Sequence, residues 1–257
     1  MTSAPDITAM MLVRDRAGLL KHAAASVLAQ SEPSFELLIL DDGSTDDTWS
    51  VAEQLAAADP RVRLLRNFRS AGIPAARNQV LAEARGRVIA ICDSDDVSRP
   101  DRFAAQLAAL DADPELVGVG GRFELFETAP RSGSEPSWHW GLRDGRLPFA
   151  FPTAMLRADS LREVGGFDER WPVAEDLQLA YRLAAAGGSF ALVNEVVLDY
   201  RVHAGSSSSR ALRREWNTLR AQLFGLRALR GRFTLRGYLV LVQSALRCVL
   251  AALGLRR

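Results

Sequence analysis

The chain has 257 residues, of which 48% are hydrophobic and 25% charged. This composition excludes a disordered or fibrous protein, and the length suits one large globular domain with an appendage. Residues 206–257 contain eleven arginines and one acid, a net charge of +10, so residues 1–205 carry −9 to reach the total of +1. An acidic body followed by a basic tail indicates two tasks, and we place a domain at 1–205 and a tail at 206–257.

The first residues of the chain do not resemble an export signal. Residues 1–12 lack the basic start and apolar core of a signal peptide, which predicts a cytoplasmic protein. The two cysteines lie far apart in the sequence, and Cys92 falls in an apolar run. A buried free thiol is therefore expected there rather than a disulfide or a zinc site.

The first half of the chain alternates between strand and helix patterns. Short apolar runs indicate strands, and apolar residues at helical spacing indicate the helices between them. Ser44 and Asp47 match a capping box at the start of the second helix. In chain order we expect a strand at 7–13, a helix at 18–30, a strand at 35–40, a helix from 44 or 45 to 58, a strand at 62–65, a helix at 73–84, a strand at 88–92, a helix at 100–110 and a strand at 116–126. This alternation predicts an α/β fold with a mostly parallel sheet flanked by helices.

The second half is less regular. Residues 127–148 are rich in Gly, Pro, Ser and Trp, which predicts a long loop. A helix at 175–186 and a strand at 190–198 follow, and the serines at 206–209 indicate a hinge. Beyond the hinge, residues 211–229 and 235–255 predict a helical tail.

Two acidic clusters stand where predicted strands end. They are Asp41-Asp42 and Asp93-Ser94-Asp95-Asp96. Ligands of parallel sheets bind beyond the carboxyl ends of the strands, so both clusters are candidates for a binding site. Crowded carboxylates repel one another, and a hard cation such as Mg²⁺ or Mn²⁺ relieves that repulsion. A solvated turn with Asp as a helix cap is the structural alternative, and the tetrapeptide alone gives both equal weight.

The motifs together carry a resemblance to a known family. The chain resembles family 2 glycosyltransferases of the GT-A fold over about residues 6–205. The motifs that carry the resemblance are Ser26 to Gln30, Phe35 to Thr48 with Asp41-Asp42-Gly43-Ser44, Ala71 to Asn78, Asp93-Ser94-Asp95-Asp96, Val164 to Glu169, Glu175-Asp176 and Tyr200-Arg201-Val202-His203. Each motif is modest alone, but their shared order is difficult to obtain by chance.

The resemblance assigns roles around the donor, a nucleotide sugar. It implies that Asp42 contacts the base with Asp41 supporting it, and that Arg77 lies near the base and the phosphates. Asp93 would bind the metal through water or hold the ribose. The direct ligands of the divalent cation, Mn²⁺ or Mg²⁺, would be Asp95 and His203, although a lone histidine is otherwise more often structural.

The resemblance also implies an acceptor side. Asp176 would be the general base of an inverting single displacement, although the Glu175-Asp176 pair also suits a helix N-terminus electrostatically. Glu175 would orient the base or the acceptor, and Thr153 falls where the family approaches the donor sugar. Trp171 is a candidate for stacking on a sugar ring and equally a candidate for the core.

The sequence departs from the family pattern after the first strand. Many relatives place an aromatic residue there to pack on the base, whereas this chain has Val13-Arg14-Asp15. Arg14 offers a planar guanidinium for the same stacking, or the contact is lost. UDP is the default nucleotide. The Gln-x-x-Arg-Trp motif of processive relatives is missing, which favours transfer of a single sugar.

Two features lie outside the motifs. Trp138 belongs to the predicted long loop, where it would stack on an acceptor sugar or pin the loop by burial. In the second tail helix, Gln243 and Arg247 interrupt an apolar stretch. That pattern favours an amphipathic helix on the inner face of the plasma membrane over a span, with packing on the body or on a partner subunit as the alternative.

The sequence thus predicts a hexosyltransferase of bacterial cell-surface polysaccharide or glycolipid synthesis. It would use a nucleotide-sugar donor and a glycan or lipid-linked acceptor, with no nucleic acid as partner. A sugar-1-phosphate nucleotidyltransferase is an alternative, but its Gly-rich loop with Arg or Lys is not matched by residues 13–18. A non-catalytic module that binds nucleotide sugars is the other alternative.

Overall fold

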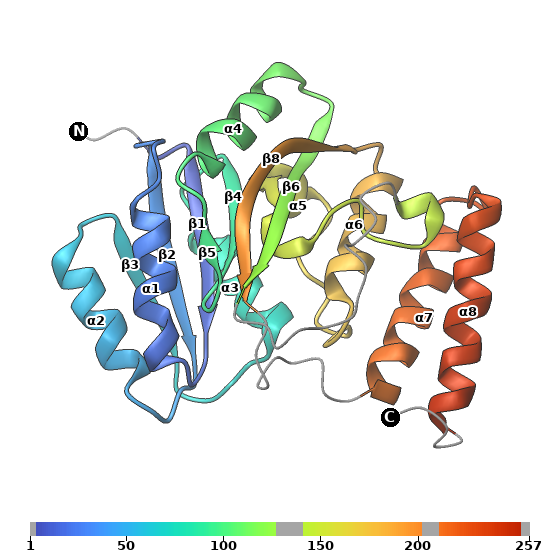
Figure 1. Cartoon of the computed structure of the whole chain (residues 1–257), viewed down its shortest axis with the longest axis horizontal. Helices are drawn as coiled ribbons and strands as arrows, with labels where there is room; N and C mark the ends of the chain where they lie inside the picture. Colours follow the sequence, from blue (N-terminus) through green and yellow to red (C-terminus); the bar gives the residue numbers. More distant parts are fainter. Residues whose placement is uncertain (1–3, 127–140, 202–210, 253–257) are drawn as a thin grey trace.

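A computed structural model describes residues 4–126, 141–201 and 211–252. The body is built on one eight-stranded sheet in the order β3-β2-β1-β4-β7-β6-β8-β5 (Figure 1). The strands are β1 Ile7–Val13, β2 Phe35–Asp42, β3 Val62–Asn67, β4 Val88–Asp93, β5 Val97–Ser98, β6 Leu116–Phe126, β7 Met155–Arg157 and β8 Ser189–Arg201. β1, β2, β3 and β4 pair in parallel, whereas β7 is antiparallel to both β4 and β6. The predicted mixed, mostly parallel sheet is therefore confirmed.

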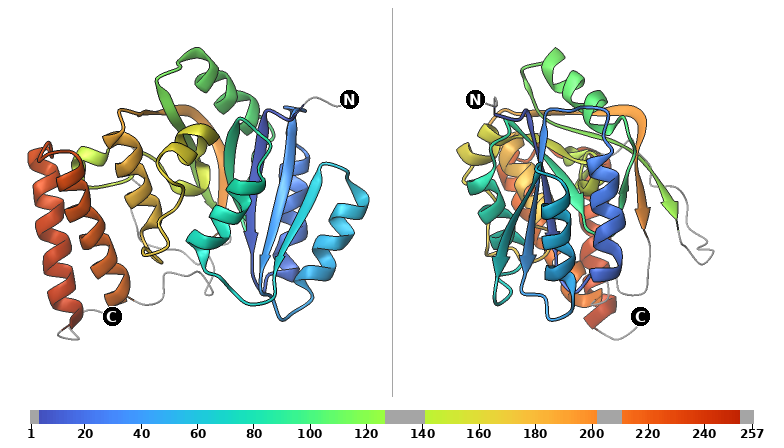
Figure 2. Two further views of the ribbon diagram at one scale, coloured as in Figure 1. Left: turned by 180° about the vertical axis from the view of Figure 1, so that it is seen from behind. Right: turned by 90° about the vertical axis from the view of Figure 1, so that its left-hand side faces the viewer.

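Helices cover both faces of the sheet and continue into the tail (Figure 2). They are α1 Ala17–Leu28, α2 Thr48–Ala58, α3 Ile73–Glu83, α4 Arg102–Ala112, α5 Ala158–Glu163, α6 Glu175–Ala185, α7 Ala211–Ala228 and α8 Leu235–Ala252, with the short 3-10 helices Leu142–Asp144 and Phe151–Thr153. One core cluster joins the sheet to α1, α2 and α4, and another joins it to α3, α5 and α6. β2 is buried along all eight residues because both of its faces are covered.

The tail packs against the body. A third core cluster joins Tyr181 and Trp171 of the body to Ala221 of α7 and to Phe233, which lies between α7 and α8. The ring of Tyr181 stacks on that of Phe233 with 6.2 Å between the ring centroids. Within the part of the chain that the structure describes, no helix is both long enough and apolar enough to cross a membrane.

Most predicted elements are confirmed, and one helix start is wrong. α2 begins at Thr48 rather than at 44 or 45, and its N-cap Asp47 makes no capping bond through its side chain. Ser44 Oγ instead accepts a hydrogen bond from the backbone N–H of Asp15, 3.0 Å away. Ser44, which was expected to cap α2, therefore joins two loops at the edge of the sheet. Within the predicted loop at 127–148, residues 127–140 lie outside the described part.

Candidate active site

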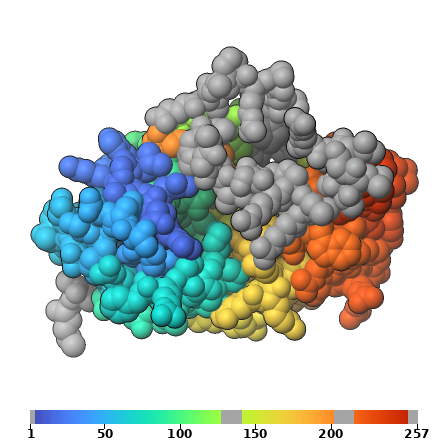
Figure 3. Space-filling model, turned by 90° about the horizontal axis from the view of Figure 1, so that it is seen from below, coloured from blue at the N-terminus to red at the C-terminus, as the bar shows by residue number. Residues whose placement is uncertain are grey.

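The carboxyl ends of β1, β2 and β4 meet at one edge of the sheet, which is the lower edge in Figure 1 and faces the viewer in Figure 3. A cavity of about 490 Å³ opens there, a size usual for ligand sites. Its lining includes Arg14, Arg16, Asp42, Ser70, Gly72, Arg77, Asp93, Ser94, Asp95 and Pro172. The sheet thus brings together four of the predicted donor residues, which are Asp42, Arg77, Asp93 and Asp95.

Asp42 is held at the end of β2 by a dense set of hydrogen bonds. Its carboxylate accepts bonds from Ser70 Oγ at 2.6 Å and Asn67 Nδ2 at 2.9 Å. It also accepts bonds from the backbone N–H groups of Ala71 at 2.8 Å and Gly72 at 3.1 Å. Burial acts to raise the pKa of Asp42, but these donors outweigh it and lower the pKa. Asp42 is therefore an anion that fixes the loop forming one wall of the cavity.

Asp41 lies one residue earlier and is fully buried. Its Oδ1 accepts a bond from the N–H of Ser44 at 2.9 Å, and its Oδ2 lies 3.8 Å from Arg66 Nε without a hydrogen bond. The intervening turn needs Gly43, which has φ +79° and whose added Cβ would lie 2.7 Å from the N atom of Ser70. Asp41 thus supports the turn beneath the cavity.

The carboxylates at the end of β4 form a compact triad. Asp93, Asp95 and Asp96 each offer an oxygen, and these oxygens lie within 4.8 Å of one another. Burial, followed by the charge of Asp93, raises the pKa of Asp96 to about 8. Burial also raises the pKa of Asp93 against the opposing charge of Arg77, and Asp95 adds to the rise. One oxygen of Asp96 is buried without a hydrogen-bond partner in the described structure.

These features fit a divalent cation. Three crowded carboxylates, of which Asp96 has a buried oxygen without a hydrogen-bond partner in the described structure, match the oxygen ligands that Mn²⁺ and Mg²⁺ prefer. A cation also offsets the burial and the repulsion that raise the pKa values of Asp93 and Asp96. The alternative of a solvated turn is disfavoured, since Asp96 is only 4% exposed.

The triad is surrounded by arginines that the sequence analysis did not single out. Arg16 Nε lies 3.9 Å from Asp95 Oδ2. Arg102 is 1% exposed beneath the triad and donates to Ser98 Oγ, Gln106 Oε1 and the carbonyl of Ile91. Its signal in the sequence is a pair of polar residues, Arg102 and Gln106, on the apolar face of a helix. A buried guanidinium there offsets part of the negative charge.

Arg77 joins the donor cavity to the first turn of α6. Its Nη1 donates to Glu175 Oε1 at 2.8 Å, and its guanidinium lies 4.8 Å from the ring centroid of Phe151 and 5.2 Å from that of Phe167. Burial raises the pKa of Glu175 against the opposing charge of Arg77. The pair fixes the start of the helix that carries Asp176.

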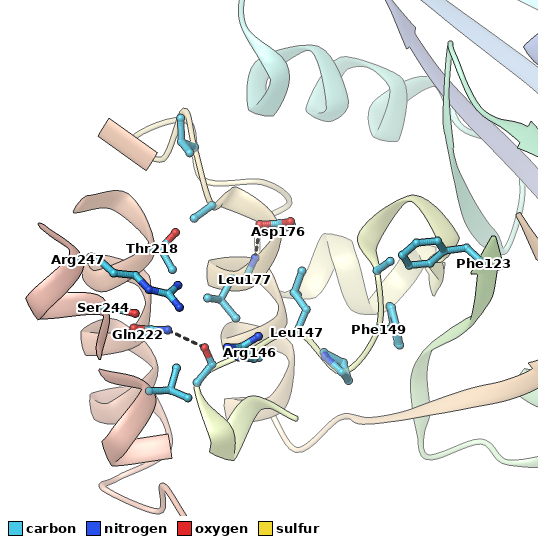
Figure 4. Close-up of a pocket in the computed structure, with 16 residues that line it drawn as sticks. Phe123, Arg146, Leu147, Phe149, Asp176, Leu177, Thr218, Gln222, Ser244 and Arg247 are labelled. Atoms are coloured by element: carbon cyan, nitrogen blue, oxygen red, sulfur yellow. Dashed lines mark hydrogen bonds between the residues drawn. The ribbon is translucent and has the colours of Figure 1, made fainter. Parts of the chain in front are cut away.

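Asp176 lies two residues after a residue with a strained backbone. Ala174 has φ +61°, a left-handed conformation that costs a non-glycine residue about 1 kcal/mol or more and is often found at functional sites. Asp176 Oδ1 accepts a bond from the N–H of Leu177 at 2.7 Å. Burial raises the pKa of Asp176 despite this bond and despite Arg77. Asp176 lines a second cavity, between the body and the tail (Figure 4).

The other predicted contacts lie apart from the donor cavity. Trp171 is 5% exposed, and its ring packs at 5.9 Å from that of Phe224 and under the guanidinium of Arg220 at 4.1 Å. Trp171 therefore packs in the core, which is the second of the two roles considered for it. Thr153 is fully buried, donates to the carbonyl of Ala150 and accepts from the N–H of Gly121. Trp138 and His203 lie outside the described residues.

The two cysteines were expected to play no part in a disulfide or a zinc site. Cys92 and Cys248 are both free and buried, as expected for Cys92. Burial raises the pKa of Cys92 to about 11, so its thiol is inert at neutral pH.

Comparison with known proteins identifies the family. The sequence model described as glycosyl transferase family 2 matches residues 8–161, more than half of the chain. The chain belongs to glycosyl transferase family 2. It is a glycosyltransferase, and its sheet and flanking helices are the GT-A-like fold of solved glycosyltransferases.

Two curated relatives and one solved structure of the same fold illustrate the similarity. The putative glycosyltransferase EpsE of Bacillus subtilis is 31% identical over 197 residues, 73% of this chain and 69% of that protein. WfaP of Escherichia coli, described as a UDP-Glc:alpha-D-GlcNAc-diphosphoundecaprenol beta-1,3-glucosyltransferase, is 28% identical over 203 residues, 76% of this chain and 78% of that protein. The structure of the mannosyltransferase PcManGT from Pyrobaculum calidifontis with GDP-Man and Mn²⁺ has a TM-score of 0.72 at 21% identity, covering 100% of this chain and 77% of that one.

Proposed function

We propose that this glycosyltransferase moves a single hexose from a nucleoside diphosphate sugar, with UDP favoured, to a hydroxyl of a glycan or lipid-linked acceptor. The transfer inverts the anomeric carbon, is non-processive and serves the synthesis of a bacterial cell-surface polysaccharide or glycolipid. In this proposal residues 1–205 carry the chemistry, and residues 206–257 form a tail that acts at the cytoplasmic face of the membrane.

One observation carries the proposal, which is the position of Asp176. Its neighbour Glu175 binds Arg77 of the donor cavity, and its own charge acts on Asp93 of the triad. At the same time Asp176 lines the separate cavity beside the tail. A base between the donor cavity and a second cavity suits a transfer between two substrates that enter from different sides.

The chain's own groups supply the steps of a single displacement. Asp176 takes the proton of the acceptor hydroxyl while the hydroxyl oxygen attacks the anomeric carbon of the donor sugar. The bond between that carbon and the diphosphate oxygen breaks at the same time. A raised pKa makes Asp176 a stronger base than an ordinary aspartate. Arg77 faces the donor cavity, where a positive charge stabilises the departing nucleoside diphosphate.

The donor residues have matching roles. Asp42, with Asp41 beneath it, shapes the wall that holds the base, and Asp93 binds the ribose or a metal-bound water. A divalent cation held by Asp95, with Asp96 of the triad and His203, would neutralise charge on the diphosphate. WfaP, whose description names UDP-Glc, supports UDP as the favoured nucleotide, whereas the mannosyltransferase structure contains GDP-Man.

A thermal-shift screen of nucleotide sugars with and without Mn²⁺ tests the proposal. A ligand that binds the native state raises its stability by RT ln(1 + [L]/Kd), about 2.7 kcal/mol at a hundredfold excess over Kd. We expect one nucleotide sugar to raise the Tm only when Mn²⁺ is present. If no nucleotide sugar shifts the Tm under either condition, the proposal fails. Binding without any release of nucleoside diphosphate would instead indicate a non-catalytic module.

A further inference from the structure

The cavity between the body and the tail has a volume of about 530 Å³. One wall comes from residues 145–150 and the start of α6, and the other comes from α7 and α8 (Figure 4). Asp176 lies on the body wall, so the proposed base faces this cavity. This position suits the entry of the acceptor.

The two walls bring arginines together. Arg146 of the body and Arg247 of α8 both line the cavity, and Figure 4 shows their side chains entering it from opposite walls. Partial burial lowers the pKa of Arg146, and the positive charges of Arg247 and Arg236 lower it further. Cations that converge in a concave site raise the local affinity for an anion.

Uncharged polar groups complete the lining. Gln222 of α7 is 2% exposed and donates through Nε2 to the carbonyl of Gly145 at 2.9 Å, which ties the tail to the wall that carries Arg146. Its Oε1 is buried without a hydrogen-bond partner in the described structure. Ser244 of α8 is 3% exposed and lines the same cavity. A buried acceptor without a partner costs free energy, so Gln222 is suited to receive a hydroxyl of a ligand.

The outer face of α8 is apolar and exposed. Residues at spacings of three and four form one stripe along the helix, with exposed fractions from 54% to 79%: Leu235, Leu239, Val242, Leu246 and Val249. The helix that contributes Arg247 to the cavity thus also carries an apolar surface. An amphiphile with an anionic head matches both features, because its head group would lie in the cavity and its chain along α8.

We infer that Arg146 and Arg247 bind a phosphate or diphosphate group of the acceptor while its hydroxyl reaches Asp176. This inference rests on the proposed function because it takes Asp176 as the base. Arginine is suited to the task, since its planar fork binds phosphate oxygens in pairs. The apolar stripe of α8 assigns the phosphate to a lipid-linked acceptor.

Calorimetry with the full chain tests this subsite. The donor cavity is first saturated with Mn²⁺ and the nucleoside diphosphate found in the thermal-shift screen. Farnesyl diphosphate, inorganic pyrophosphate, farnesol and glucuronate are then titrated in turn. We expect farnesyl diphosphate to bind more tightly than pyrophosphate, and farnesol and glucuronate not to bind. Equal binding of the two diphosphates would support the subsite and assign it to a soluble phosphorylated acceptor.

The matched variants are Arg146→Gln, Arg247→Gln and Arg227→Gln. Arg227 belongs to α7 and is exposed, but it does not line the cavity. Because a hydrogen bond to a charged group contributes about 1.5–3 kcal/mol, Arg146→Gln or Arg247→Gln should weaken diphosphate binding by roughly 10- to 100-fold. Arg227→Gln should leave it unchanged.

Three results would overturn the inference: no diphosphate binding, glucuronate binding as tight as that of pyrophosphate, or equal weakening by all three variants. Affinity for the nucleoside diphosphate serves as the fold control, and we expect it to match the wild type in each variant. A wild-type protein that binds no nucleoside diphosphate contradicts the proposed function instead, so the two failures are distinguishable.

Discussion

The two cavities of this enzyme are similar in size and differ in the charged groups that line them. The donor cavity, about 490 Å³, lies where parallel strands end and sets the carboxylates of Asp42, Asp93 and Asp95 beside three arginines, Arg14, Arg16 and Arg77. The cavity beside the tail, about 530 Å³, lies between a loop of the body and two helices and gathers arginines. Crowded carboxylates hold a diphosphate through a cation, whereas arginines hold a phosphate directly. We propose that this enzyme uses both solutions, on either side of Asp176.

Removal of one carboxylate at the donor cavity should have the largest effect on binding. We expect Asp95→Ala to abolish the part of nucleoside diphosphate affinity that depends on Mn²⁺, because it removes an oxygen of the triad. Calorimetry with and without Mn²⁺ measures it. Diphosphate binding beside the tail should be unaffected, and a parallel loss there would mean that the two cavities do not act separately.

Titration of Asp176 should affect activity and stability in opposite ways. Its pKa is raised, so kcat should fall with decreasing pH at values above those at which an ordinary aspartate protonates. The same shift stabilises the fold fully below the unfolded-state pKa, and that stabilisation is lost as pH rises through the folded-state pKa.

The stability of Asp176→Asn checks the sign of this effect. The Tm of the variant minus that of the wild type should grow with increasing pH, because only the wild type must bury a charge. The Asn side chain still offers an oxygen to the N–H of Leu177. A Tm difference that shrinks as pH rises would show that Asp176 is stabilised as an anion.

A substitution at the contact between the tail and the body should have a smaller effect. At Gly225 of α7, an added Cβ would lie 2.1–2.3 Å from ring atoms of Tyr181. Gly225→Ala should therefore lower the free energy of unfolding by about 1–3 kcal/mol, the usual cost of overpacking. It should also weaken diphosphate binding while donor binding persists.

Gly18→Ala in α1 is the matched control for Gly225→Ala. An added Cβ at Gly18 meets nothing within 4 Å, and alanine favours a helix by roughly 1 kcal/mol over glycine. Thermal unfolding of both variants measures the difference. An equal gain in stability at both positions would contradict the packing of α7 on Tyr181.

The sequence predicted the donor side better than the acceptor side, for a physical reason. The strand ends at Asp42 and Asp93 follow from short apolar runs, and parallel strands bring their carboxyl ends to one edge. The start of α2 was misplaced because Ser44 bonds to Asp15, a partner from another loop. Local capping patterns do not show such a competing bond.

The acceptor side depends on contacts between distant segments. Arg146 and Arg247 stand 101 residues apart in the sequence. The packing of α7 on α6, and of α8 on α7 and on the 3-10 helix Leu142–Asp144, brings them to one cavity. Trp171 has the residue type of a sugar-stacking side chain, yet the tail covers it. Neither outcome is encoded in a motif, since both follow from the way two apolar surfaces meet.

The most direct test of the account is Asp176→Asn, with turnover and donor affinity measured side by side. Its carboxylate is the proposed base between the two cavities, and positioned general-base catalysis contributes about 10²–10⁴-fold. With the donor found in the thermal-shift screen, we predict unchanged affinity by calorimetry and a kcat for release of nucleoside diphosphate that falls by about that factor. Unchanged turnover, or a loss of donor affinity as large as the loss of turnover, would contradict the account.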